Sequence, residues 1–332
     1  MNRSWMLALV AAGCEPESAA TDKDPADSAG TDSSDTDTGN PNPDCEVHLT
    51  STTPNSGAVG WYYRDSLALE FDGDGSSASI AVNDPSGIAA AQTVEWSEGS
   101  LIATVSPTLA ANTTYSLDVD ICGASNSIPF TTSDIGAPLT LTDEELTGRV
   151  FNFVLSDAEI TDPAVLEAID DTTFPVPLLF EVTASMGQIA LMGAIGGYLE
   201  DGTLVQHPEH DTFYFPAADF SETPHFEVAT ELVTISYGGR DVPMNDFSLS
   251  GEFMSDGSAI VKGKIVTLLD TRYIGPLLGQ PDTPEAACDF AGSLGIYCEA
   301  CPDGEELCLH MSGEEITANY YEGMDLVDIA VE

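Results

Sequence analysis

The feature that most constrains this fold is a long series of short apolar runs, each ended by a turn sequence. Six such runs lie at 66–71, 78–82, 93–96, 101–105, 114–119 and 127–132. Several of them alternate apolar and polar residues, the period that places one face of a strand in a core. Polar and glycine-rich stretches such as 72–75 and 83–87 separate the runs, as expected for turns between strands. The pattern predicts a β-sandwich.

A second, larger series follows a boundary at 134–138. Strands are predicted at 146–155, 178–184, 188–195, 212–215, 226–237, 246–253, 259–269 and 307–319. The pair 246–253 and 259–269 is predicted to form a hairpin around Asp256 and Gly257, and Gly196 and Gly197 are expected to end the strand before them. Helices are predicted at 163–169, with Asp162 as N-cap, and at 273–278 and 285–294.

Strands that follow one another through short turns, without crossover helices, imply an antiparallel sheet. Seven or eight of them in about 195 residues are typical of a barrel or sandwich. The sequence thus predicts a mainly β protein: a sandwich over 45–134, then a larger antiparallel barrel or sandwich over 138–332 with a short disulfide-rich helical segment.

Charge excludes two classes of partner. The chain has 332 residues, with 8 Lys+Arg against 56 Asp+Glu, and its formal net charge is -48. Nucleic acid and an anionic membrane surface would both be repelled by such a chain. Because 42% of the residues are hydrophobic, the chain can still bury substantial cores. We therefore interpret the acidity as a source of solubility rather than as a binding device.

The first 14 residues are predicted to be an export signal. Arg3 precedes an apolar run at 5–10, and small residues lead to Cys14, the order found in secretory signals. The ending Ala-Ala-Gly-Cys resembles a bacterial lipobox. That resemblance implies that the thiol of Cys14 is diacylated, that the preceding peptide is removed, and that Cys14 becomes the mature N-terminus.

Residues 15–44 are predicted to be an acidic, disordered tether. The stretch has no aromatic residue and no Val, Leu or Ile, and Lys23 is its only base. Such a segment cannot bury enough apolar surface to offset its ordering entropy. A spacer of this kind suits a domain held away from a bilayer.

Seven cysteines are an odd number for an exported protein, but six remain if Cys14 carries lipid. These six are predicted to form disulfides: Cys45, Cys122, Cys288, Cys298, Cys301 and Cys308. Cys45 and Cys122 bracket the first domain, whereas the last four allow three pairings. Two alternatives stay open for the last four: a zinc site, and a redox dithiol at Cys298 and Cys301. An oxidising envelope favours disulfides.

The first β-domain resembles the bacterial Ig-like domains of the S-layer (SbsA) type. The resemblance rests on Thr-Pro-Asn-Ser-Gly at 53–57, Leu-Ala-Leu-Glu-Phe at 67–71, the stretch 107–117 and Ile-Pro-Phe-Thr-Thr at 128–132. It implies a spacer or stalk module in which Tyr115 is a packing residue. We accordingly interpret 72–75 as a hairpin turn rather than a calcium site.

The second domain is similar to envelope lipoproteins of deltaproteobacteria, including myxobacteria. The similarity rests on Leu-Thr-Gly-Arg-Val-Phe at 146–151, Ser-Gly-Glu-Phe-Met-Ser-Asp-Gly at 250–257 and the stretch 295–304. The similarity implies a location in the cell envelope and gives no indication of a particular activity.

One stretch could hold a metal. His207, His210 and Asp211 offer nitrogen and oxygen ligands, with His225 nearby in sequence. Their spacing differs from that of a helical His-Glu-x-x-His site and includes Pro208, so a solvated loop is the favoured interpretation. The sequence contains neither a Gly-x-Ser-x-Gly elbow nor a glycine-rich phosphate loop with lysine.

These features together predict an exported, non-enzymatic lipoprotein of the outer membrane or cell surface of a Gram-negative bacterium. We expect a covalent lipid anchor, no cofactor, and a structural or binding role at the cell surface or in the periplasm. The sequence leaves open whether a protein or a glycan is the partner. One alternative is carriage of a lipid or small ligand in a β-barrel cavity. The other is a metal-dependent hydrolase at His207 and His210.

Overall fold

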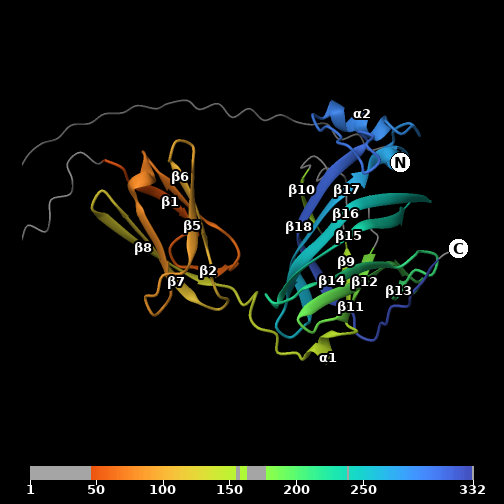
Figure 1. Ribbon diagram of the computed structural model, residues 1–332, viewed down its shortest axis with the longest axis horizontal. Coiled ribbons are helices and arrows are strands. Elements are labelled where there is room, and N and C mark those ends of the chain that lie inside the picture. The colour runs from red at the N-terminus through yellow and green to blue at the C-terminus, as the bar shows by residue number, and fades with distance from the viewer. Residues whose placement is uncertain (1–45, 155–157, 163–176, 238, 331–332) are drawn as a thin grey trace, which may run out of the picture. The chain divides into compact units, whose positions relative to one another are not determined.

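A computed structural model describes residues 46–154, 158–162, 177–237 and 239–330 (Figure 1). Most of the described chain is strand, which confirms the mainly β class. Residues 49–132 form two four-stranded sheets. The first has the order β1 (Leu49–Thr53), β3 (Leu67–Phe71), β6 (Ile102–Pro107), β5 (Gln92–Ser97), and the second β2 (Ala58–Trp61), β8 (Ala124–Thr132), β7 (Thr114–Ile121), β4 (Ser79–Asn83).

The two small sheets share one core, as expected for a β-sandwich. Leu67, Leu69 and Phe71 alternate into it from β3. Tyr115 is buried, stacks on Phe130 with 5.8 Å between ring centroids, and accepts a 2.9 Å hydrogen bond from the amide of Ala110. Its position is that of a packing residue. The stretch 72–75 is not the expected hairpin turn, because β3 and β4 lie in different sheets; the chain bends at Asp72 and Gly73 and enters the 3₁₀ helix η1 (Gly75–Ser77).

The remaining strands form one ten-stranded antiparallel sheet that curves into a half-barrel (Figure 1). Eight strands follow the order β13 (Leu204–Gln206), β12 (Gln188–Tyr198), β11 (Pro177–Ala184), β9 (Val150–Val154), β18 (Cys308–Tyr320), β17 (Ala259–Asp270), β16 (Arg240–Phe253), β15 (His225–Tyr237). In addition, β10 (Glu159–Asp162) pairs with β18 and β14 (Phe213–Asp219) with β12. The expected count of seven or eight strands was therefore too low.

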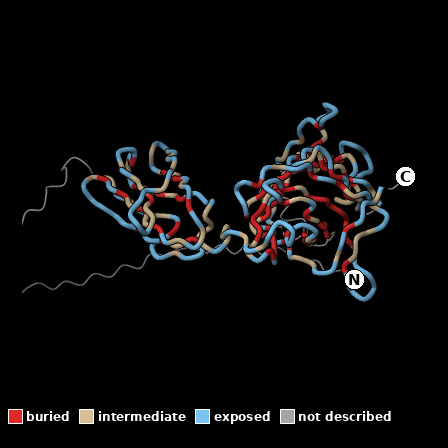
Figure 2. The backbone as a smooth tube through the Cα atoms, turned by 60° about the horizontal axis from the view of Figure 1, so that its bottom comes forward, coloured by how far each residue is buried: buried red, intermediate tan, exposed pale blue. Residues whose placement is uncertain are grey.

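Aromatic rings dominate the main core of this sheet, and Figure 2 shows buried stretches of its strands toward the inside of the curve. The ring of Phe180 lies 5.8–6.1 Å from the rings of Phe153, Phe213 and Phe215. Phe213 and Phe215 are buried, whereas Tyr214 between them is 49% exposed. Period-two alternation thus selects which residues of β14 enter the core.

Several predicted strand boundaries were wrong, and two of them have a clear physical cause. The run 146–155 is not one strand, because the short helix α1 (Asp143–Leu146) ends at Leu146 and β9 begins at Val150. Gly196 and Gly197 do not end β12, which continues to Tyr198. A Cβ atom on Gly196 would lie 3.0 Å from Pro177. The glycine therefore permits close approach of neighbouring strands rather than a turn.

The predicted hairpin of 246–253 and 259–269 is present as β16 and β17. A tighter hairpin precedes it, since β15 pairs with β16 from Tyr237 opposite Arg240 to His225 opposite Glu252. The predicted helix at 163–169 lies outside the described residues. The helices expected near 273–278 and 285–294 are present as η4 (Thr271–Tyr273), η5 (Gly275–Leu278) and α2 (Ala286–Ser293).

Two disulfides close the C-terminal segment, which confirms disulfide bonding there. Cys288 pairs with Cys298, and Cys301 pairs with Cys308. The four sulfurs are therefore not zinc thiolates, and the two cysteines of the C-x-x-C motif bond to different partners. Disulfides persist in oxidising compartments, so they indicate an exported protein. Cys122 is also disulfide-bonded, but Cys45 lies outside the described residues, and its pairing stays a prediction.

Gly193→Ala is expected to destabilise the protein by about 1–3 kcal/mol, because overpacking a filled core displaces its neighbours. An ideal Cβ at Gly193 would lie 2.1 Å from the ring of Phe213. The matched control is Gly292→Ala in α2, where a Cβ meets nothing within 4 Å and alanine favours the helix by roughly 0.5–1 kcal/mol. Urea unfolding measures both, and equal midpoints for the two variants would contradict the expectation.

Candidate functional site

The most unusual group in the described chain is the carboxylate of Glu252. Glu252 lies on β16 between Gly251 and Phe253, and its side chain is 0% exposed. An irregularity in the pairing of β16 with β17 falls at Ser250 and Glu252. His225, directly opposite on β15, places Nδ1 3.0 Å from Oε1 of Glu252. A buried carboxylate requires such partners, because burying an unpaired charge is costly.

Three consecutive residues between β2 and β3 reach the same oxygen. The hydroxyls of Tyr62 and Tyr63 donate to Oε1 of Glu252 at 2.8 and 2.9 Å. Nε of Arg64 lies 3.2 Å from that oxygen and donates to the Tyr63 hydroxyl at 2.9 Å. Within the described chain, Oε2 of Glu252 is buried without a hydrogen-bond partner. Four polar atoms therefore surround Oε1, whereas Oε2 has no hydrogen-bond partner among the described residues. We call Tyr62, Tyr63, Arg64, His225 and Glu252 the Glu252 cluster.

Neighbouring contacts fix the geometry of this cluster. The ring of Tyr63 lies against Gly136, where an added Cβ would be 2.1 Å from the ring. Gly136 has a φ of +90°, which glycine adopts without strain. Arg64 also forms an ion pair with Glu222 at 2.5 Å, and Lys262 lies over the ring of Tyr62 at 5.4 Å.

The electrostatics keep both tyrosines protonated. Burial raises the pKa of Tyr62, and the adjacent Glu252 carboxylate raises it further. Burial also raises the pKa of the Tyr63 hydroxyl. At neutral pH both hydroxyls therefore carry their protons and donate them to Glu252 as hydrogen bonds.

An open pocket of about 600 Å³ adjoins the cluster. Arg64, Glu222 and His225 line it together with residues of β14 and β15. Two members of the cluster therefore face a space large enough for a small ligand.

The structure brings together the two histidines expected in a loop. His207 follows β13, and its ring stacks on that of His210 with 4.3 Å between centroids. Burial lowers the pKa of His210, and the nearby His207 lowers it further. Both histidines are half-buried, whereas Asp211 is exposed. The pair supplies two imidazole ligands, one fewer than the three protein ligands of a catalytic zinc site, and its metal role stays a prediction.

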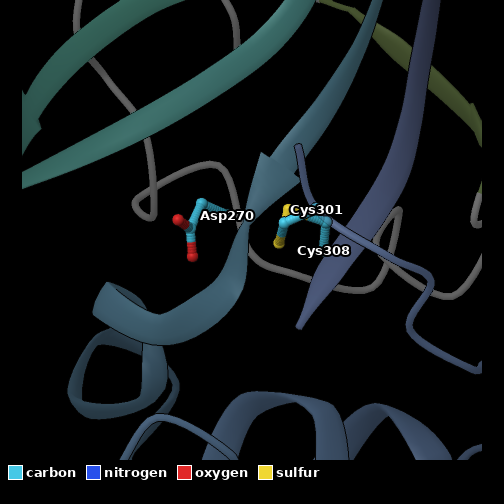
Figure 3. A group of neighbouring side chains, drawn as sticks. All are labelled: Asp270, Cys301 and Cys308. Carbon is cyan, nitrogen blue, oxygen red and sulfur yellow. A yellow bond between two sulfur atoms is a disulfide. The ribbon is translucent and has the colours of Figure 1, made fainter. Parts of the chain in front are cut away.

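A third group is explained without a ligand. Oxygen and sulfur atoms of Asp270, Cys301 and Cys308 lie within 4.8 Å of one another, and Figure 3 shows the Asp270 carboxyl group near the two cysteines. The two sulfurs form a disulfide. The carboxylate is bound by Arg272, with Nη2 2.6 Å from Oδ2. The disulfide and the ion pair with Arg272 therefore account for this group without a bound metal.

The scarce cations of the larger sheet are also engaged within the chain. Arg240 pairs with an aspartate, Lys262 and Lys264 pair with glutamates, and the guanidinium of Arg149 donates to backbone carbonyls. These pairs balance the acidic surface and leave Arg64 as the cation beside the pocket.

Sequence reasoning did not find the Glu252 cluster. Glu252 stands in an alternating strand at a position expected to face solvent, and it is buried because distant residues cover it. One signal was present in Tyr62-Tyr63-Arg64, where two adjacent aromatic hydroxyls precede one of only eight basic residues.

The sequence matches no protein-family model and no curated protein. Among solved structures, the chain is similar to CopC from Methylosinus trichosporium OB3b, with 18% identity over 26% of this chain and 94% of that one. The TM-score is 0.23, and a likeness of this size does not bear on function. Among the described residues, no helix has the length and apolarity needed to cross a membrane.

Proposed function

We infer that this chain is a cell-envelope lipoprotein with a non-catalytic structural or binding role. In this proposal Cys14 carries the lipid, residues 15–44 form the tether, and the two β-regions form the exported part. The resemblance of 45–134 to Ig-like spacers supports a stalk function. Charge supports a covalent rather than an electrostatic membrane link, because a protein of net charge -48 is repelled by anionic lipid.

The observation that carries the structural role is the hydrogen bonding of Tyr62 and Tyr63 to Glu252. These contacts join the end of β2 to the larger sheet through a buried carboxylate. Such contacts favour a fixed connection between the end of β2 and the larger sheet. A spacer needs a connection of this kind, which a flexible linker does not provide.

The alternatives have less support. Carriage of a lipid needs an internal cavity, whereas aromatic side chains fill the main core of the described sheet. A hydrolase at His207 and His210 gains support from the stacked rings, but it needs a third ligand.

Replacing Cys14 with serine is expected to move the protein from the membrane fraction to the soluble fraction, because the lipid is the proposed anchor. In a Gram-negative host, fractionation with a high-salt wash measures this, and mass spectrometry of the mature N-terminus identifies the modification. Lys23→Gln, which removes the single base of the tether, is the matched control and should remain with the membranes. An unlipidated Cys14 in the mature protein would refute the proposal.

A further inference from the structure

His225 and Glu252 form an imidazole–carboxylate pair beside the open pocket. Nδ1 of His225 lies 3.0 Å from Oε1 of Glu252, whose side chain is 0% exposed. An ionised carboxylate only accepts hydrogen bonds, so Nδ1 is the nitrogen that donates and Nε2 keeps its lone pair. His225 lines the pocket with Nδ1 turned to Glu252. Nε2 is therefore the ring nitrogen that can meet a molecule in the pocket.

The two tyrosines of the Glu252 cluster hold this pair in place. The hydroxyls of Tyr62 and Tyr63 donate to Oε1 at 2.8 and 2.9 Å, and burial raises the pKa of both, so they keep their protons. A carboxylate held by several donors stays in one position, and the imidazole bound to it keeps one tautomer and one orientation. A histidine oriented in this way can act as a general base.

Arg64 adds a hydrogen-bond donor to the same pocket. Its Nε donates to the Tyr63 hydroxyl and its Nη2 to Glu222, whereas Nη1 has no hydrogen-bond partner in the described part of the chain. A guanidinium N–H beside a reacting carbonyl stabilises the oxyanion that forms there. The pocket of about 600 Å³ lies within the roughly 300–1,000 Å³ of small-molecule sites. It thus offers a base and an oxyanion donor to one small substrate.

The lining of the pocket restricts both the substrate and the nucleophile. Asp219, Glu222 and Glu227 place three carboxylates around it, which outnumber its one guanidinium and repel acidic ligands. Among the described residues that line the pocket, none is a serine, threonine or cysteine, the usual nucleophiles of covalent catalysis. Water is therefore the nucleophile, and an uncharged ester fits, because its leaving oxygen needs only the proton that the base has taken.

We propose that this pocket hydrolyses uncharged carboxylic esters, with His225 as general base, Arg64 as oxyanion donor and Glu252 as a positioning residue. Nε2 of His225 takes a proton from water while the water oxygen bonds to the carbonyl carbon, and the carbonyl electron pair moves to the oxygen beside Arg64. That pair returns as the bond to the alcohol oxygen breaks, and the proton on Nε2 passes to this leaving oxygen. The products are a carboxylic acid and an alcohol, and the histidine is neutral again. This activity goes beyond the proposed structural role and does not depend on the lipid anchor.

The test uses the purified full-length protein and 4-nitrophenyl acetate, an uncharged ester whose hydrolysis is followed by absorbance. His225→Gln is expected to lower the rate by about 100- to 10,000-fold, the usual contribution of a positioned base. Arg64→Gln should lower it by about 100-fold, the cost of one oxyanion donor. His310→Gln is the matched control, because His310 makes a similar contact with Asp162, at 2.9 Å, but both side chains are exposed and neither lines the pocket. This control should hydrolyse the ester as the wild type does.

Further readouts separate catalysis from loss of structure. The wild-type rate should fall in acid, where a proton occupies the lone pair of the base, and should be lower in D₂O, because a proton moves in the transition state. Glu252→Gln should lower kcat more than it raises KM, since it disturbs the base and not the binding of the ester. Thermal unfolding identifies variants that fail to fold. Equal rates for the wild type and the folded His225→Gln variant would overturn the proposal. A wild-type rate unchanged in D₂O, which indicates direct attack by an imidazole, or no hydrolysis above the buffer rate, would overturn it as well.

Discussion

Replacing Glu252 with alanine is expected to lower the free energy of unfolding of the protein by about 3 kcal/mol. The substitution removes the acceptor that Tyr62, Tyr63 and His225 share. Breaking a buried charged network costs about 3–5 kcal/mol, and the lower end applies because Arg64 and His225 are partly exposed and water solvates them. Urea unfolding followed by tyrosine fluorescence measures the change.

Glu227→Ala on β15 is the matched control, since Glu227 is an exposed carboxylate close to the same pocket. A surface substitution of this kind changes stability by at most about 0.5 kcal/mol. Glu252→Gln should fall between the two, because the amide keeps one acceptor oxygen and loses the negative charge. If Glu252→Ala and Glu227→Ala unfolded at the same urea concentration, the buried carboxylate would have no structural role.

Phe180→Ala is expected to destabilise the larger sheet by about 3–5 kcal/mol, the usual cost of removing a buried phenylalanine. Its ring lies within 6.1 Å of three other rings, those of Phe153, Phe213 and Phe215. These neighbours lie on two other strands, β9 and β14, whose backbones are held in the sheet, so the rings cannot all move in to fill the cavity. The measurement is the unfolding midpoint in urea, converted with a common slope.

Tyr214→Ala tests the same prediction from the opposite face of β14. Tyr214 lies between Phe213 and Phe215 and is 49% exposed, so its truncation should cost at most about 1 kcal/mol. A similar loss for Phe180→Ala and Tyr214→Ala would mean that the face of the sheet that carries Phe180 is not the core.

The features that could be predicted follow from the pattern of residues along the chain. The alternation in β3, β7 and β16 identified those strands, because a side chain in a strand faces one of two sides. The C-terminal cysteines were predicted to be disulfide-bonded from the oxidising compartment, but their pairing was open among three. The pairing depends on Cys308 starting β18, which places it beside Cys301.

Errors arose where a residue has two possible roles. Gly196 and Gly197 were expected to end a strand, yet β12 passes through them because Pro177 lies close on the neighbouring strand. A glycine signals either a turn or a close approach, and only the partner strand distinguishes the two.

The sequence by itself determined the mainly β class, the core-facing residues of β3 and β7, and a formal net charge of -48. These properties depend on neighbouring residues or on sums over the chain. Only the tertiary structure decided that Glu252 is buried and that Tyr62, Tyr63 and Arg64 surround it. Glu252 is separated from each of these three residues by 188 or more positions in the sequence. A contact at that separation depends on how whole sheets pack rather than on any local pattern.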